Sequence, residues 1–205
     1  MIIKAVFFVS LTSISLPAAC DAKRFVITGG PGVGKTTLIN ELKQQGYQTV
    51  PEIYGELYAH AVAHNMLASF FADPCALYTQ LLEEQIKYES LLDMHMPAFL
   101  DRSAIDILAF AQYFNVPLSE QFCERALREY DTIFLLDPLP RHLYEQCARR
   151  KETQEEAACL HAMIKLMYIS KGYQEQQLID VPFGTPLQRI EFIFAALKSI
   201  NGIVP

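Results

Sequence analysis

The chain has 205 residues, of which 51% are hydrophobic and 20% are charged, a composition typical of a globular protein with one core. Its formal net charge of -6 argues against a general nucleic-acid binder, which needs a basic face to neutralise phosphates. The five scattered cysteines include no C-x-x-C pair, which argues against a disulfide framework and against a structural zinc site.

The first twenty residues differ in composition from the rest of the chain. They contain one lysine, no acidic residue, and a run of apolar and hydroxyl side chains that ends in small residues such as Ala18 and Cys20. This pattern is typical of a secretory leader, and an extra strand or sequence upstream of the true start is the alternative. The run is too short and too polar for a membrane anchor, so no stable membrane insertion is expected. We therefore expect a leader or extra segment over 1–22 and a single nucleotide-binding domain over 23–205.

Short apolar runs typical of strands alternate with segments of helical periodicity along the rest of the chain. Such alternation predicts parallel βαβ units, with helices on both faces of one sheet of about five strands. The predicted strands are 24–28, 47–50, 98–100, 132–136 and 178–181. The predicted helices are 35–45, 52–71, 77–94, 103–114, 153–170 and 186–199.

The stretch RFVITGGPGVGKTTLINEL (24–42) matches the phosphate-loop pattern G-x-x-x-x-G-K-[ST] between a predicted strand and a predicted helix. Glycines let the backbone N–H groups turn inward around a phosphate, beside the positive end of the helix. Lys35 can bridge the terminal phosphates, and the Thr36 hydroxyl can bind Mg²⁺. The predicted nucleotide-binding residues of this loop are Gly29, Gly30, Gly32, Val33, Gly34, Lys35, Thr36 and Thr37. Together with the strand-helix alternation, the motif predicts an α/β, three-layer P-loop NTPase fold.

Two acidic residues follow predicted strands and could hold the metal. Asp101 ends PAFLD and is followed by Arg102, which places a cation beside a carboxylate at one strand end. Asp137 ends TIFLLD, but the Pro-Leu-Pro that follows is more typical of a turn. We therefore predict Asp101, together with Thr36, as the Mg²⁺ ligands.

With these residues in place, the chain resembles AAA-type nucleotide-binding domains related to the kinase domain of NadR-type ribosylnicotinamide kinases. The similar segments run from about residue 24 to residue 194. They are VITGGPGVGKTTLINEL, YQTVPEIYGEL, FLDRSAIDILAF, IFLLDPLP, RRKETQEEA and IDVPFGTPLQRIEFI. TVPE and DRS are also similar to segments of deoxyribonucleoside kinases.

The resemblance implies transfer of the γ-phosphoryl group to an acceptor hydroxyl. In this mechanism Glu52 accepts the hydroxyl proton, while Lys35, Arg102 and Mg²⁺ balance the phosphate charge. The alternative for Glu52 is stabilisation of the helix that begins after Pro51. The pattern S-x-x-D at 103–106 suggests a capping box, and the resemblance adds a substrate-facing role for Asp106 as the alternative.

Two further segments gain a role from the resemblance. RRKE (149–152) resembles a lid that places arginines on the transferring phosphates, which makes Arg149 and Arg150 candidates and Arg141 a weaker one. A solvated charge run is the alternative. VPFGT (181–185) resembles a loop beside the nucleotide base, in which Phe183 stacks on the base, or it is a simple turn.

Two sets of ring side chains receive structural interpretations. His60 and His64 are spaced by four residues on a predicted helix without an H-E-x-x-H motif, so they are interpreted as an exposed helical face. The Tyr and Phe residues between 54 and 78 could line an acceptor pocket, but we interpret them as core.

The sequence thus favours an ATP-dependent, Mg²⁺-requiring small-molecule kinase with a nucleoside-like acceptor. The alternative is a regulatory nucleotide-binding switch with little or no transferase activity, and a slow NTP hydrolase is a third possibility. No N-K-x-D motif selects a purine, so GTP is an alternative to ATP. Dependence on a cellular nucleotide favours the cytoplasm, with export as the alternative if residues 1–20 are a true leader.

Overall fold

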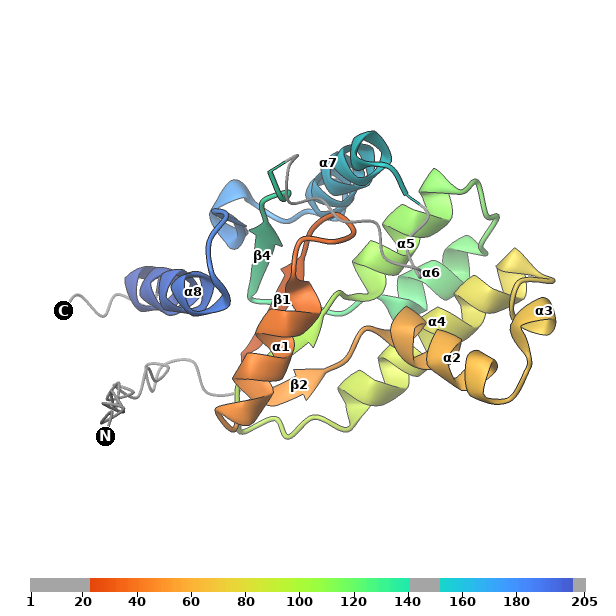
Figure 1. Cartoon of the computed structure of the whole chain (residues 1–205), viewed down its shortest axis with the longest axis horizontal. Coiled ribbons are helices and arrows are strands. Elements are labelled where there is room, and N and C mark those ends of the chain that lie inside the picture. Colours follow the sequence, from red (N-terminus) through yellow and green to blue (C-terminus); the bar gives the residue numbers. More distant parts are fainter. Residues whose placement is uncertain (1–22, 141–151, 201–205) are drawn as a thin grey trace, which may run out of the picture.

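The computed structural model describes residues 23–140 and 152–200 of the chain. In this part, five parallel strands form one sheet with the order β2-β3-β1-β4-β5, which confirms the predicted sheet (Figure 1). The strands are β1 (Arg24–Thr28), β2 (Gln48–Val50), β3 (Ala98–Asp101), β4 (Thr132–Leu136) and β5 (Leu178–Val181). Because β1 is central, the loop that follows it lies between the ends of β3 and β4.

Helices cover both faces of the sheet, as parallel strands require. On one face, side chains such as Phe25 and Phe134 pack against α1 (Lys35–Gln44) and α8 (Pro186–Ile200). On the other face, side chains such as Val26 and Ile133 pack against three longer helices and a short one. These are α4 (Pro74–Ser90), α5 (Ala104–Tyr113), α7 (Gln154–Ser170) and α6 (Glu120–Ala126). The three-layer α/β prediction is therefore confirmed.

Several helix limits differ from the predicted ones for local reasons. The single helix expected over 52–71 is α2 (Ile53–Ala63) followed by α3 (Leu67–Phe70), and Asn65 between them has a left-handed φ of 56°. Helix α4 begins at Pro74, earlier than predicted, because the Asp73 side chain accepts a hydrogen bond from the Ala76 N–H. The short helix α6 and a 3₁₀ turn, η3 (Glu175–Gln177), were not predicted.

Capping boxes begin two helices, and one of them is the box predicted at 103–106. Ser103 and Asp106 begin α5, and Thr153 and Glu156 begin α7, with both reciprocal hydrogen bonds formed in each case. None of the helices in the described ranges is long and apolar enough to cross a membrane. The leader predicted over 1–22 lies outside those ranges and stays a prediction.

Candidate nucleotide-binding and phosphotransfer site

The loop between β1 and α1 has the backbone that the phosphate-loop motif predicts. Gly29, Gly32 and Gly34 have φ values of 133°, 85° and 91°, which side chains with a β-carbon rarely adopt. Gly34 is the N-cap residue of α1, so the N-terminal N–H groups of the helix lie at the loop. Such a helix start attracts anions, which fits a phosphate.

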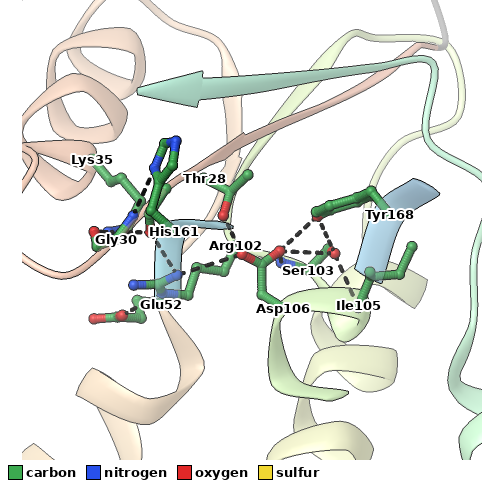
Figure 2. A network of polar contacts seen from close by, with 11 residues as sticks. Thr28, Gly30, Lys35, Glu52, Arg102, Ser103, Ile105, Asp106, His161 and Tyr168 are labelled. Carbon is green, nitrogen blue, oxygen red and sulfur yellow. Dashed lines mark hydrogen bonds and ion pairs between the residues drawn. The ribbon is translucent and has the colours of Figure 1, made fainter. Parts of the chain in front are cut away.

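Gly30 is needed for a different reason, which is its close approach to α7. A β-carbon at Gly30 would lie 2.6 Å from the carbonyl oxygen of Ala157. The Gly30 N–H also points to His161 Nδ1, at 3.4 Å (Figure 2). Burial lowers the pKa of His161, which favours the neutral ring that can accept this bond. The loop therefore lies directly against α7.

Gly30→Ala is expected to destabilise the fold by about 1–3 kcal/mol, because the new methyl group forces the loop and α7 apart. The free energy of urea unfolding measures this. Gly55→Ala is the matched control, because Gly55 lies within α2 and its new β-carbon would lie 3.5 Å from Glu52 Oε2, an ordinary contact distance. Alanine in a helix is expected to stabilise the fold by about 0.5–1 kcal/mol relative to glycine. Equal stability of Gly30→Ala and the native chain would mean that the loop and α7 separate without cost.

Lys35, the lysine of the motif, is buried and bound by its own loop. Its Nζ donates to the carbonyl oxygens of Gly30 at 2.8 Å and Gly29 at 3.5 Å. Burial, followed by repulsion from Arg102, lowers the pKa of Lys35 to about 8. The ammonium group thus lies inside the phosphate loop and is held by backbone carbonyl oxygens of that loop.

Asp101 and Thr36 meet beside Lys35. The Thr36 Oγ1 donates to Asp101 Oδ2 at 2.8 Å, and Asp101 ends β3, next to Ile27 of β1. Burial raises the pKa of Asp101 to about 6, although the charge of Lys35 lowers it. Within the described ranges, Asp101 Oδ1 is a buried oxygen without a hydrogen-bond partner. The Thr36 hydroxyl and the Asp101 carboxylate, one oxygen of which is unused, are oxygen donors that fit Mg²⁺.

Arg102 connects the phosphate loop to Glu52 (Figure 2). Its Nε donates to Glu52 Oε1 at 2.9 Å, and its Nη1 donates to the Gly29 carbonyl at 3.1 Å. Its backbone has a left-handed φ of 71°, and its guanidinium carbon lies 4.8 Å from the centre of the Phe110 ring. Burial alone would lower the pKa of Arg102, but Glu52 and Asp106 together raise it, so the group stays a cation.

Asp106 is fully buried behind Arg102. Its carboxylate accepts hydrogen bonds from the Ser103 N–H at 3.0 Å, the Tyr168 hydroxyl at 2.6 Å and the Thr28 hydroxyl. Arg102 Nη1 lies 3.4 Å from its Oδ1. These partners occupy the carboxylate, which agrees with the capping interpretation and leaves no exposed surface for a substrate-facing role.

A family model described as an AAA domain matches residues 24–189, which is most of the chain. The chain belongs to this AAA-domain family. The matched range begins at β1 and includes the phosphate loop, Glu52, the DRS segment and Arg189.

Solved structures whose fold is similar to that of this AAA domain include NadR and a thymidylate kinase. A NadR structure in complex with NAD and AMP-PNP has a TM-score of 0.61 and 19% identity, and the match covers 92% of this chain and 52% of that one. A NadR structure in complex with NR has a TM-score of 0.60 and 18% identity, and the match covers 89% of this chain and 50% of that one. Thymidylate kinase from Ehrlichia chaffeensis has a TM-score of 0.56 and 12% identity, and the match covers 84% of this chain and 97% of that one.

The AAA domain spans about half the length of the NadR structures that it matches. At these identities the likeness establishes the fold. A comparison with the curated proteins finds no match.

A cavity of about 170 Å³ lies beside the phosphate loop of the AAA domain. Its lining includes Gly34, Thr37, Leu38, Leu139, Gly184 and Pro186, with Arg189. Phe183 is 46% exposed and its ring centre lies 5.6 Å from the Arg189 guanidinium carbon. The predicted base-flanking loop therefore borders a cavity.

Arg189 is a residue that the sequence did not single out. Its Nη1 donates to the Val33 carbonyl of the phosphate loop, and its Nη2 lies 3.4 Å from the Asp137 carbonyl. Asp137 also donates its N–H to Val181 at 2.9 Å, so its backbone joins the strand ends, as expected of a turn residue. In the sequence, Arg189 resembles a solvated helical cation, and only the fold shows that it is buried.

The aromatic residues after Glu52 only partly belong to the core of the AAA domain. Phe70 and Tyr78 pack against it, but Tyr54 is 40% exposed and Phe71 is 47% exposed, so the core interpretation is wrong for these two. Tyr54 and Tyr58 stack with ring centres 6.1 Å apart, one helical turn along α2. The helix that follows Glu52 therefore presents an exposed aromatic ring close to it.

The remaining predicted residues are placed as follows. Arg149 and Arg150, and the weaker candidate Arg141, lie outside the described residues, so the lid stays a prediction. His60 and His64 are exposed and stack with ring centres 4.1 Å apart, as expected of a helical surface. The fold brings five predicted residues from three separate strand ends into one group: Lys35, Thr36, Glu52, Asp101 and Arg102.

Proposed function

We propose that this AAA domain is a Mg²⁺-dependent phosphotransferase that passes the γ-phosphoryl group of ATP or GTP to a hydroxyl of a small, nucleoside-like acceptor. The observation that carries the proposal is the 2.9 Å ion pair between Arg102 and Glu52, because Arg102 also binds the phosphate-loop carbonyl of Gly29. A carboxylate is thereby held beside the terminal phosphate position, where a proton acceptor for transfer is needed.

The phosphate loop would hold the nucleotide. The N–H groups of the loop and of the first turn of α1 surround the phosphates, and Lys35 exchanges its contacts with Gly29 and Gly30 for phosphate oxygens. Thr36 and Asp101 would hold Mg²⁺, which when bound neutralises charge on the phosphates. Phe183 and the cavity beside Arg189 are the proposed site of the base.

Glu52 and Arg102 would carry out the transfer on the acceptor side. Glu52 takes the proton of the acceptor hydroxyl, whose oxygen forms the new bond to the γ-phosphorus, while the bond to the bridging oxygen of the β-phosphate breaks. The Arg102 guanidinium stabilises charge on the transferring group, and Arg149 and Arg150 are proposed to close over it. The products are the phosphorylated acceptor and a nucleoside diphosphate.

A nucleoside-like acceptor is supported by two observations. The exposed Tyr54 ring follows Glu52 by two residues, and an aromatic ring is a surface on which a planar base stacks. Solved structures of the same fold include NadR with NR and a thymidylate kinase. Since the proposed reaction consumes a nucleoside triphosphate, we place the protein in the cytoplasm.

The test is release of nucleoside diphosphate from Mg·ATP and Mg·GTP with a panel of ribonucleosides, deoxyribonucleosides and nicotinamide riboside. We expect at least one acceptor to raise the rate well above the rate with water alone, with the phosphorylated acceptor identified by mass spectrometry. Nucleotide binding without acceptor-dependent release, for every acceptor in the panel, would contradict the kinase and favour a nucleotide-binding switch. Equal release with and without acceptors would favour a slow NTP hydrolase.

A further inference from the structure

Tyr168 reaches the site from α7, far from the phosphate-loop motif in sequence (Figure 2). Its buried hydroxyl donates to Asp106 Oδ2 at 2.6 Å and lies 2.7 Å from Ser103 Oγ. Burial raises the pKa of Tyr168 well above the usual value, so the phenol stays neutral and keeps its proton. The hydroxyl is therefore a permanent hydrogen-bond donor to a buried carboxylate.

We propose that Tyr168 is a positioning residue: through Asp106, it sets how the Arg102 guanidinium is shared between Asp106 and Glu52. The catalytic consequence rests on the proposed function, whereas the positioning itself does not.

The geometry explains why the two carboxylates compete. Arg102 offers its Nε to Glu52 at 2.9 Å and its Nη1 to Asp106 at 3.4 Å. Asp106 tolerates the longer contact because uncharged donors, among them Thr28, Ser103 and Tyr168, already satisfy it. A buried carboxylate that loses a donor must recover the lost interaction elsewhere, since an unsatisfied buried charge is costly. The cation beside Asp106 is Arg102, whose Nη1 lies 3.4 Å from its Oδ1.

Removal of the Tyr168 hydroxyl should therefore draw the guanidinium towards Asp106 and away from Glu52. The phenyl ring need not move, because Tyr168 also packs edge-on against Tyr173 with ring centres 5.4 Å apart. The effect on Arg102 is thus separable from the loss of packing.

The experiment compares Tyr168→Phe with Tyr173→Phe. Both variants lose a phenol, but the Tyr173 hydroxyl bonds to the backbone of Tyr130 and Arg128. The readout is the ¹⁵N–¹H signal of Arg102 Nε, assigned by its loss in Arg102→Lys. We expect Tyr168→Phe to shift this signal and to speed its exchange with water about tenfold, which corresponds to loss of about one hydrogen bond. Tyr173→Phe should leave it unchanged.

A second variant should shift the Arg102 signal in the opposite direction, which a folding defect would not do. Fluorotyrosine at position 168 keeps the ring and makes its hydroxyl a stronger donor, so the Arg102 signal should move in the opposite direction and exchange more slowly. An Arg102 signal that is the same in the native chain, Tyr168→Phe and the fluorotyrosine variant would overturn the proposal, as would an equal shift in Tyr173→Phe.

Kinetics separate this proposal from the proposed function. With an acceptor that the native chain phosphorylates, Tyr168→Phe should lower kcat about tenfold and leave the Kd for Mg·ATP unchanged. An unchanged kcat despite a shifted Arg102 signal would restrict Tyr168 to a structural role and overturn its positioning of a catalytic pair. If the native chain phosphorylates no acceptor, the proposed function fails, and the Arg102 signal still decides whether Tyr168 positions the guanidinium.

Discussion

Lys35→Ala is expected to weaken binding of Mg·ATP by about a hundredfold, which corresponds to about 2.7 kcal/mol. A hydrogen bond to a charged group contributes about 1.5–3 kcal/mol, and the buried ammonium lies inside the loop that would surround the phosphates. The alanine variant also loses the bond to the Gly30 carbonyl, so the loop itself is less well held. Isothermal titration with Mg·ATP and Mg·GTP measures the affinity directly.

The control for this change is Lys43→Ala, which removes an exposed lysine from the last turn of the same helix. We expect Lys43→Ala to bind nucleotide like the native chain. Urea unfolding of both variants shows whether a lost affinity reflects a lost fold. Native-like affinity of a folded Lys35→Ala variant would contradict the proposed role of Lys35 in binding the phosphates. No binding of Mg·ATP or Mg·GTP by the native chain would contradict the kinase and the switch hypotheses together.

Glu52→Gln is expected to lower acceptor-dependent phosphoryl transfer by about 10²–10⁴-fold, the usual contribution of a general base. Glutamine has nearly the same shape and still offers an oxygen to Arg102 Nε, so the ion pair becomes a neutral-acceptor hydrogen bond. Nucleotide affinity should stay within a few-fold of native, because Glu52 contacts the acceptor and not the phosphates in the proposed mechanism. Single-turnover measurement of phosphorylated acceptor separates the chemical step from binding.

Glu56→Gln, one turn further along α2 and exposed, provides the matched control and should turn over like the native chain. Native-like transfer by Glu52→Gln would assign Glu52 to the structural role of holding Arg102 and the start of α2. A large loss of nucleotide affinity at unchanged kcat would give the same answer.

The strands and the phosphate loop could be predicted because their signals are local. Strands buried on both faces appear as apolar runs, and the loop carries its glycines, lysine and threonine within nine residues. The capping box at Ser103 and Asp106 is local for the same reason. The helix break at Asn65 was missed because a left-handed turn can occur within a sequence of high helical propensity.

The contacts that organise the site could not be predicted, since they join distant parts of the chain. Arg189 reaches Val33 across 156 residues, and Tyr168 reaches Asp106 across 62 residues. Neither position carries a motif, and both side chains are compatible with an ordinary amphipathic helix. Glu52 and Arg102 were each predicted, but the ion pair between them depends on β2 and β3 being neighbours in the sheet.

The left-handed backbone at Arg102 has a consequence for attempts to improve this protein. An L-residue in that conformation costs about 1–2 kcal/mol, and glycine or asparagine would adopt it more easily. A protein-engineering scheme that ranks substitutions by backbone compatibility will therefore favour replacing the residue that joins Glu52 to the phosphate loop. At this position, the backbone conformation favours glycine or asparagine, whereas the proposed chemistry needs arginine. Thermal stability and turnover should therefore be optimised separately.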